Sequence, residues 1–194
     1  MLTSLVGSEM CIRDRRELFQ VWQNALSKEK ISKILNVVNK SSLSDASIFS
    51  TYEPMQTIRR SKICWISDEW IKKLLWEYVL KANKKSFQVD VENSSEVQFT
   101  EYRYNENGHY DWHHDVNWNG QKSFDRKLSV TIQLSEIDDY LGGDFEFEEI
   151  KTNVNFKSLG TIIIFPSYLR HRVSPVTFGV RRSLVAWFYG SQWR

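Results

Sequence analysis

The segment Tyr104–Asp115 reads YNENGHYDWHHD and holds three of the four histidines of this 194-residue chain. Its His113 and Asp115 are two residues apart. On a β-strand, positions i and i+2 point to the same face, so this imidazole and this carboxylate can bind one ion together. His109 and Asp111 repeat the spacing just before them. Taken alone, each pair is more often a solvated loop histidine beside an acid than a metal site.

The remaining histidine, His171, follows the apolar stretch GTIIIFP at residues 160–166. This stretch is typical of a buried strand, which could carry His171 to the same end of the fold as His113 and Asp115. Two histidines and one carboxylate on one side of an octahedral ion leave three positions open. Non-haem Fe(II) oxygenases use that arrangement.

A basic residue near the C-terminus offers a second kind of site. Arg181 lies ten residues after His171, beyond a predicted turn at residues 175–179 and at the start of the last predicted strand. Ser183 shares its face by the period of two. A guanidinium and a hydroxyl on one inward face suit the bidentate capture of a carboxylate. The alternative is that Arg181 and Arg182 form only a charged strand end.

Two helices are predicted ahead of these segments. The first begins after the N-cap Ser27 and the second after Ser67, and each N-cap follows a hydrophobic residue. Apolar residues recur at helical spacing, at Ile31, Ile34, Leu35 and Val38 in the first helix and at Ile71, Leu74, Leu75, Tyr78, Val79 and Ala82 in the second. The second apolar stripe is wide enough to cover one face of a sheet.

After Asn83 the period of the apolar residues changes from 3.6 to 2, which predicts strands. The predicted strands are Phe87–Val91, Val97–Phe99, Leu128–Leu134, Asp144–Glu148, Thr161–Phe165 and Arg182–Tyr189. Turns are predicted at Asn107-Gly108, Gly142-Gly143, Pro166-Ser167 and Gly179. Helices followed by strands indicate a mainly β, α+β fold in which N-terminal helices pack on a sandwich or barrel.

Taken together, these motifs resemble the 2-oxoglutarate- and Fe(II)-dependent oxygenases, in the prolyl 4-hydroxylase-like branch that includes PKHD-type hydroxylases. The matching motifs are Tyr104…Gly108-x-Tyr110-x-x-His113-x-Asp115, Arg126-x-x-Ser129, Gly142-Gly143 and His171-x-Val173-x-Pro175-Val176-Thr177-x-Gly179-x-Arg181. The similarity covers about residues 59–187. It implies a double-stranded β-helix core, also called a jelly-roll or cupin-like core, over about residues 86–194, with the helices before about residue 85.

The resemblance also implies a set of site residues. It selects His113 and Asp115 over the earlier pair, with His171 as the third Fe(II) ligand, and it leaves His114 pointing away. Arg181 would bind the distal carboxylate of 2-oxoglutarate, and further contacts to this cosubstrate would come from Tyr104, Ser129 and Ser183. The interval from Tyr104 to Gly108 is one residue longer than the usual form.

The implied enzyme is a 2-oxoglutarate-dependent dioxygenase. It would hydroxylate a prolyl or other side chain of a protein or peptide, release succinate and CO2, and use ascorbate as a possible reductant. One alternative is an oxygenase acting on a free amino acid, small metabolite or nucleobase, and another is a non-catalytic jelly-roll that binds a metal or ligand. Substrate choice depends on loops. Trp112, Trp118 and the loop 117–125 either line the substrate entrance or serve as ordinary packing and surface connection.

The composition excludes several other classes of protein. The chain is 41% hydrophobic and 26% charged, as in ordinary globular proteins. A net charge of +2 gives no indication of a nucleic-acid partner, and no apolar run approaches the ~18 residues of a membrane span. Two cysteines exclude a disulfide scaffold and a four-cysteine zinc site. We expect a cytoplasmic protein of bacterial or phage origin, while its oligomeric state stays open.

The first fifteen residues, MLTSLVGSEMCIRDR, are set apart from the predicted domain at residues 16–194. The run Leu5–Asp14 resembles a translated sequencing adaptor. We therefore expect residues 1–15 to be a non-native tail; the alternative is a genuine flexible N-terminus. Without this tail, Cys64 is the single cysteine that remains.

Overall fold

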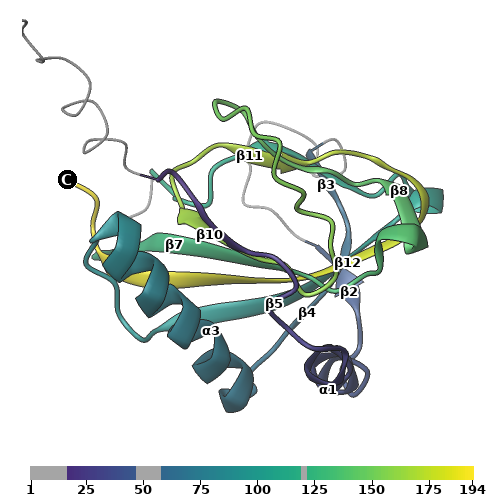
Figure 1. Ribbon diagram of the computed structural model, residues 1–194, viewed down its shortest axis with the longest axis horizontal. Helices are drawn as coiled ribbons and strands as arrows, with labels where there is room; N and C mark the ends of the chain where they lie inside the picture. The colour runs from purple at the N-terminus through teal and green to yellow at the C-terminus, as the bar shows by residue number, and fades with distance from the viewer. Residues whose placement is uncertain (1–16, 47–57, 119–121) are drawn as a thin grey trace, which may run out of the picture.

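The computed structural model describes residues 17–46, 58–118 and 122–194 (Figure 1). The predicted non-native tail at residues 1–15 lies outside these described residues, and so does part of the predicted loop 117–125.

Two antiparallel β-sheets face each other and form the body of the protein. The larger sheet contains β1 (Gln20–Trp22), β10 (Ile162–Pro166), β7 (Phe124–Gln133), β12 (Val176–Ser191), β5 (Ser95–Arg103), β4 (Lys62–Trp65) and β2 (Ser44–Asp45), in that order, and β8 (Tyr140–Gly142) also pairs with β12. The smaller sheet contains β3 (Arg59–Arg60), β6 (His109–His113), β11 (His171–Val173) and β9 (Phe145–Phe147). The predicted mainly β fold with N-terminal helices is confirmed.

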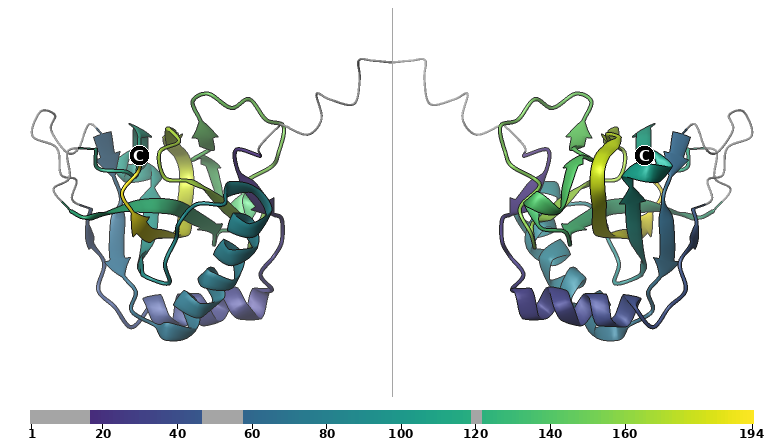
Figure 2. Two further views of the ribbon diagram at one scale, coloured as in Figure 1. Left: turned by 90° about the vertical axis from the view of Figure 1, so that its left-hand side faces the viewer. Right: turned by 90° about the vertical axis from the view of Figure 1, so that its right-hand side faces the viewer.

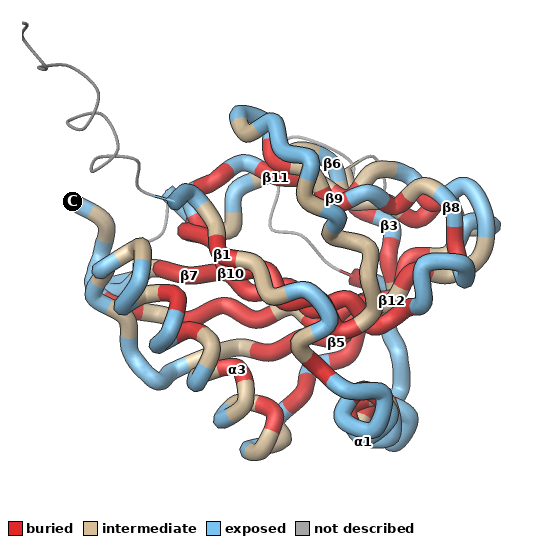
Figure 3. Tube along the Cα trace, viewed as in Figure 1, coloured by how far each residue is buried: buried red, intermediate tan, exposed pale blue. Residues whose placement is uncertain are grey.

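Among the described residues, two α-helices cover the outer face of the larger sheet (Figure 2). They are α1 (Lys28–Val38) and α3 (Glu69–Ala82), and their buried side chains pack against the sheet residues Leu128, Ile132, Leu184 and Phe188. Figure 3 shows that buried residues follow the central strands of this sheet. Within the described ranges, no helix is both long and apolar enough to cross a membrane.

The helix N-caps are partly as predicted. The Ser27 hydroxyl accepts a hydrogen bond from the Lys30 backbone N–H at 3.4 Å, which confirms the first N-cap. The second helix begins after Asp68 rather than Ser67. The Asp68 carboxylate accepts the Trp70 N–H at 3.1 Å, and the extended backbone of Asp68 places the first helical residue at Glu69.

The strand predicted at residues 87–91 is wrong. Helix α3 runs directly into a π-helical turn, η1 (Asn83–Phe87), which ends at Gln88 in the left-handed conformation (φ 52°). The Asn83 side chain then bonds both the N–H and the C=O of Val89, at 2.9 and 2.8 Å. A neighbouring strand would need this N–H and this C=O group of Val89 for its own hydrogen bonds. The alternating apolar residues instead pack beside the helix as an irregular segment.

Gly179 lies inside β12, where the sequence predicted a turn before the last strand. Strand β12 pairs first with β8 and then, beyond Gly179, with β5 and β7. Gly179 has a φ of +71°, and a Cβ built on it would lie 1.9 Å from the carbonyl oxygen of Asp139. Glycine is therefore required where β12 passes close to the segment before β8.

Substitution of Gly179 by alanine is expected to destabilise the fold by about 3 kcal/mol, because it adds both a left-handed-region penalty and a backbone clash. Urea unfolding should show a lower midpoint for Gly179→Ala than for Thr177→Ala, an exposed position on the same strand. Equal midpoints for the two variants would contradict the close packing of β12 on Asp139.

Candidate active site

The larger sheet turns a row of polar side chains toward the smaller sheet. The strand register places Ser129 of β7 opposite Trp187 of β12, and Ser183 of β12 opposite Thr100 of β5. The buried polar residues of this inner face are Gln98, Thr100, Ser129, Thr131, Arg181 and Ser183. Since an ordinary core face is apolar, this polar face indicates a binding site between the two sheets.

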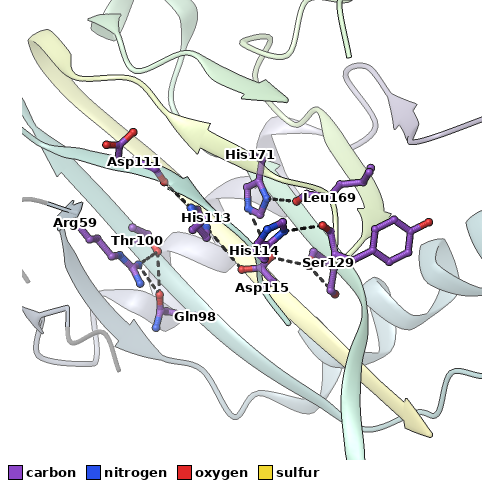
Figure 4. A network of polar contacts seen from close by, with 12 residues as sticks. Arg59, Gln98, Thr100, Asp111, His113, His114, Asp115, Ser129, Leu169 and His171 are labelled. Atoms are coloured by element: carbon purple, nitrogen blue, oxygen red, sulfur yellow. Dashed lines mark hydrogen bonds and ion pairs between the residues drawn. The ribbon is translucent and has the colours of Figure 1, made fainter. Parts of the chain in front are cut away.

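His113, Asp115 and His171 meet at the centre of this space (Figure 4). His113 ends β6 and His171 begins β11, and the two residues are direct partners across the smaller sheet. His113 Nε2 lies 3.7 Å from Asp115 Oδ1, and His171 Nε2 lies 3.6 Å from Oδ2. One ligand atom from each residue falls within 4.8 Å of the others. The structure thus assembles the three predicted ligands.

The hydrogen bonds of the two imidazoles fix their tautomers. His113 Nδ1 lies 2.7 Å from the Asp111 carbonyl oxygen, and His171 Nδ1 lies 2.9 Å from that of Leu169. A carbonyl only accepts, so each Nδ1 carries a proton and each Nε2 faces Asp115. Burial, followed by the nearby charge of His171, lowers the pKa of His113 to about 3. Two Nε2 atoms and a carboxylate therefore face one another, an arrangement that fits a bound cation.

Asp115 is held as a carboxylate. Burial acts to raise its pKa, but its charge interactions with His171, His113 and Arg126 and the hydrogen bond from Ser129 lower the pKa below its ordinary value. The Ser129 hydroxyl donates to Oδ2 at 2.6 Å. Ser167 lies 2.9 Å from the Ser129 oxygen and donates to it, because the Ser129 proton is already engaged. Ser129 thus orients a predicted ligand, while the cosubstrate contact predicted for it stays a prediction.

Substitution of Ser129 by alanine is expected to weaken Fe(II) binding about 10- to 100-fold, the usual effect of removing a hydrogen bond to a metal ligand. Anaerobic Fe(II) titration would measure this change. Thr131→Ala serves as the control, because Thr131 lies two residues along the same face of β7. Equal affinities of the two variants would show that the Ser129 hydroxyl does not support Asp115.

Arg181 is a buried guanidinium with no ion-pair partner among the described residues. Its Nη1 donates to Ser183 Oγ at 3.3 Å, its guanidinium carbon lies 5.5 Å from the centre of the Tyr102 ring, and its Nε has no hydrogen-bond partner. Arg181 and Ser183 line the same cavity as the three ligands. A buried cation with an unused donor fits the binding of an anion.

Tyr104 does not reach this cavity. It begins a 3-10 turn, η2 (Tyr104–Glu106), is 54% exposed and stacks on Phe178. Tyr102, on β5, is 3% exposed and lies beneath Arg181. The additional residue between Tyr104 and Gly108 is accommodated by η2 and by Asn107 in the left-handed conformation (φ 52°). The structure thus places Tyr102, rather than Tyr104, in the lining of the cavity.

The sequence prediction also missed Tyr110 and Arg59, which line the cavity. The register between β6 and β11 shifts between Tyr110 and His113, so these residues face the same side although they are three apart. The Tyr110 ring stacks on the His113 ring with the centres 3.5 Å apart. Arg59 reaches the site because β3 pairs with β6.

The remaining candidates lie outside the cavity. Asp111 is exposed and its carboxylate accepts the Trp112 backbone N–H at 2.7 Å. His114 Nδ1 donates to the Tyr168 carbonyl at 2.7 Å, so it turns away from the ligands as predicted. Arg172 covers the Trp112 ring at 4.6 Å, and Trp118 is 59% exposed. Neither Trp112 nor Trp118 is among the described residues that line the cavity.

Comparison with known proteins agrees with this geometry. The sequence profile of the 2OG-Fe(II) oxygenase superfamily matches residues 97–189. A PKHD-type hydroxylase of Crocosphaera subtropica is 24% identical over 170 residues, which cover 86% of this chain and 76% of that protein. A PKHD-type hydroxylase of Synechococcus sp. CC9311 is 40% identical over 82 residues, or 41% of this chain; the match spans only 36% of that relative.

The crystal structure of a Pseudomonas putida prolyl-4-hydroxylase superposes with a TM-score of 0.70 and 19% identity, covering 90% of this chain and 94% of that one. This likeness confirms the predicted jelly-roll fold. Fold and relatives together define a 2-oxoglutarate-dependent dioxygenase. The profile match and the PKHD-type relatives, on a shared fold, support membership of the 2OG-Fe(II) oxygenase superfamily, in its PKHD-type, prolyl 4-hydroxylase-like branch.

Proposed function

We propose that the protein is an O2- and 2-oxoglutarate-dependent Fe(II) hydroxylase that acts on a prolyl side chain of a protein or peptide and releases succinate and CO2. One observation carries the proposal. The Nε2 atoms of His113 and His171 face the Asp115 carboxylate in the same buried cavity as Arg181, which has no ion-pair partner among the described residues.

Each residue has a definite part in this proposal. His113, Asp115 and His171 would hold Fe(II), and Arg181 with Ser183 would hold the distal carboxylate of 2-oxoglutarate. When bound, iron and cosubstrate would supply O2 activation: 2-oxoglutarate gives two of the four electrons that reduce O2, and the C–H bond that is oxidised to C–OH gives the other two. The apolar walls of the cavity, among them Phe145, Phe165, Val185 and Trp187, exclude bulk water from the reacting centre.

The peptide substrate is proposed from the relatives. A Trichoplax adhaerens prolyl hydroxylase, of the same fold at a TM-score of 0.68, was solved with a hypoxia inducible factor peptide fragment bound. The relatives that match in sequence are named hydroxylases. By extension, we propose a prolyl-containing peptide for this chain, with ascorbate as the reductant that maintains Fe(II) and the cytoplasm as its location.

The proposal is tested by succinate release from purified protein supplied with Fe(II), 2-oxoglutarate and air. We expect slow release without substrate and stimulation by a pool of prolyl peptides, with His171→Ala inactive in both conditions. Stimulation by amino-acid or oligonucleotide pools instead of peptides would reassign the substrate. The absence of release in every condition would contradict the enzyme activity and favour a non-catalytic binding protein.

A further inference from the structure

The cavity contains a second buried guanidinium, that of Arg59, which is 7% exposed. Its Nε donates to Ser61 Oγ at 2.9 Å, and its Nη2 donates to Gln98 Oε1 at 2.8 Å and lies 3.5 Å from Thr100 Oγ1. Its guanidinium carbon lies 4.6 Å from the centre of the Tyr110 ring. Neutral groups therefore hold this cation in one orientation at the edge of the site (Figure 4).

Among the described residues, no carboxylate neutralises Arg59. The acids around it are committed elsewhere: Glu101 pairs with Arg103 and Arg182, while Asp45 and Glu106 pair with Lys62. A buried charge that meets only neutral partners is costly. The cost is recovered when the cavity takes up an anion.

The charges of the loaded site leave Arg59 as the residual cation. In the loaded site, Fe(II) and Arg181 would supply positive charge. Asp115 and the 2-oxoglutarate dianion would supply an equal negative charge, so the charges of these four groups cancel. Arg126, which also lies near Asp115, is already bonded to Glu96 at 2.7 Å. One positive charge, on Arg59, remains for the primary substrate.

Arg59 is also close to the reacting centre. The Tyr110 ring is 4.6 Å from the guanidinium carbon and 3.5 Å from the His113 ring, so these two separations keep the guanidinium within about 8 Å of the His113 ring. One residue of extended chain spans about 3.3–3.6 Å. A carboxylate bound by Arg59 would therefore belong to the hydroxylated residue itself or to its immediate neighbour.

We infer that Arg59 binds a carboxylate of the primary substrate, next to the carbon that is hydroxylated. The inference rests on the proposed function and sharpens its substrate class to prolyl compounds with an adjacent carboxylate. Three sources share this chemistry: an acidic side chain beside the proline, the free carboxylate of a C-terminal proline, and the carboxylate of free proline.

The test compares matched carboxylate and amide probes. The pairs are an N-acetylated, C-amidated Ala-Pro-Asp peptide against its Ala-Pro-Asn form, a peptide ending in free proline against the same peptide ending in prolinamide, and proline against prolinamide. Turnover is followed by substrate-stimulated succinate release and by the gain of one oxygen atom in mass spectrometry. Calorimetry with the metal-free protein measures binding of each probe independently of turnover.

In the wild-type protein, the carboxylate member of one pair is expected to exceed its amide in kcat/KM and in affinity by on the order of 100-fold, as for loss of a charge-assisted pair. The preferred pair identifies the source of the carboxylate. Arg59→Met should abolish the preference and Arg59→Lys should retain part of it. In both variants the loss should be larger for the carboxylate probes than for their amides, which a general loss of activity would not produce.

Arg60→Met is the matched control, because Arg60 is the exposed neighbour on β3 and does not line the cavity. It should keep the full preference, and melting temperatures verify that each variant is folded. Equal use of acid and amide, a preference that survives in Arg59→Met, or turnover of none of the carboxylate probes would overturn the inference while substrate-free succinate release persists. Loss of that release in the wild-type protein would instead contradict the proposed function.

Discussion

Substitution of Asp115 by alanine is expected to abolish Fe(II) binding and 2-oxoglutarate turnover. Asp115 is the carboxylate between the two imidazoles, and its two oxygens lie 3.7 and 3.6 Å from their Nε2 atoms. Its loss removes all the negative charge from the ligand set. Removal of a residue that only supports a metal ligand lowers the metal affinity about 10- to 100-fold. Removal of the ligand itself should therefore lower the metal affinity more than ~100-fold.

The same substitution should leave the metal-free fold intact. The folded protein holds the Asp115 carboxylate favourably, since its pKa lies below the ordinary value, so the melting temperature of metal-free Asp115→Ala should lie below that of the wild-type protein. Added Fe(II) should raise the wild-type melting temperature by preferential binding to the folded state and leave that of the variant unchanged. His114→Ala, an adjacent histidine that bonds the Tyr168 carbonyl, should behave as wild type. Undiminished succinate release by Asp115→Ala would contradict the assignment.

Arg181→Met is expected to raise the 2-oxoglutarate KM on the order of 100-fold. The buried guanidinium has a free Nε donor and no ion-pair partner among the described residues, so it can form charge-assisted hydrogen bonds to a carboxylate. Removing one partner of such a buried pair costs about 2–5 kcal/mol of binding free energy. Arg181→Lys should restore the charge without the planar fork and recover only part of the affinity. Initial rates at varied 2-oxoglutarate concentrations measure both variants.

The control for this prediction is Arg170→Met, which removes a charge from the surface ion pair with Glu148. Its 2-oxoglutarate KM should not change. Fe(II) affinity should stay at the wild-type value in both Arg181 variants, because Arg181 is not bonded to any of the three predicted ligands. An unchanged 2-oxoglutarate KM in Arg181→Met would place the distal carboxylate elsewhere.

Local patterns allowed most of the fold to be predicted. The 3.6 period located both helices, and the period of two located the strands that form the centre of the larger sheet. The period of two gave a wrong strand at residues 87–91, because the Asn83 side chain bonds the backbone groups of Val89 that a neighbouring strand would bond. It also failed at Gly179, where a glycine that could end a strand lets β12 continue past Asp139.

The site could be predicted only as far as it depends on residues close in sequence. The spacing of His113 and Asp115 gave one candidate pair of ligands, which His109 and Asp111 repeat, and only the family resemblance selected His113, Asp115 and His171. The 3-10 turn that exposes Tyr104 and the bulge that turns Tyr110 inward depend on how single residues are accommodated. Arg59 is brought to the site by pairing of β3 with β6, about fifty residues away in the chain.

The most direct test of the account is an anaerobic titration of the metal-free protein with Fe(II) and 2-oxoglutarate, followed by visible absorption. The account predicts a weak metal-to-ligand band that saturates at one Fe(II) per chain, requires both components, and is lost in His171→Ala. In Arg181→Met the band should form only at much higher 2-oxoglutarate concentration. Fe(II) binding without any such band, or an undiminished band in His171→Ala, would contradict the assignment of His113, Asp115 and His171 as the iron site.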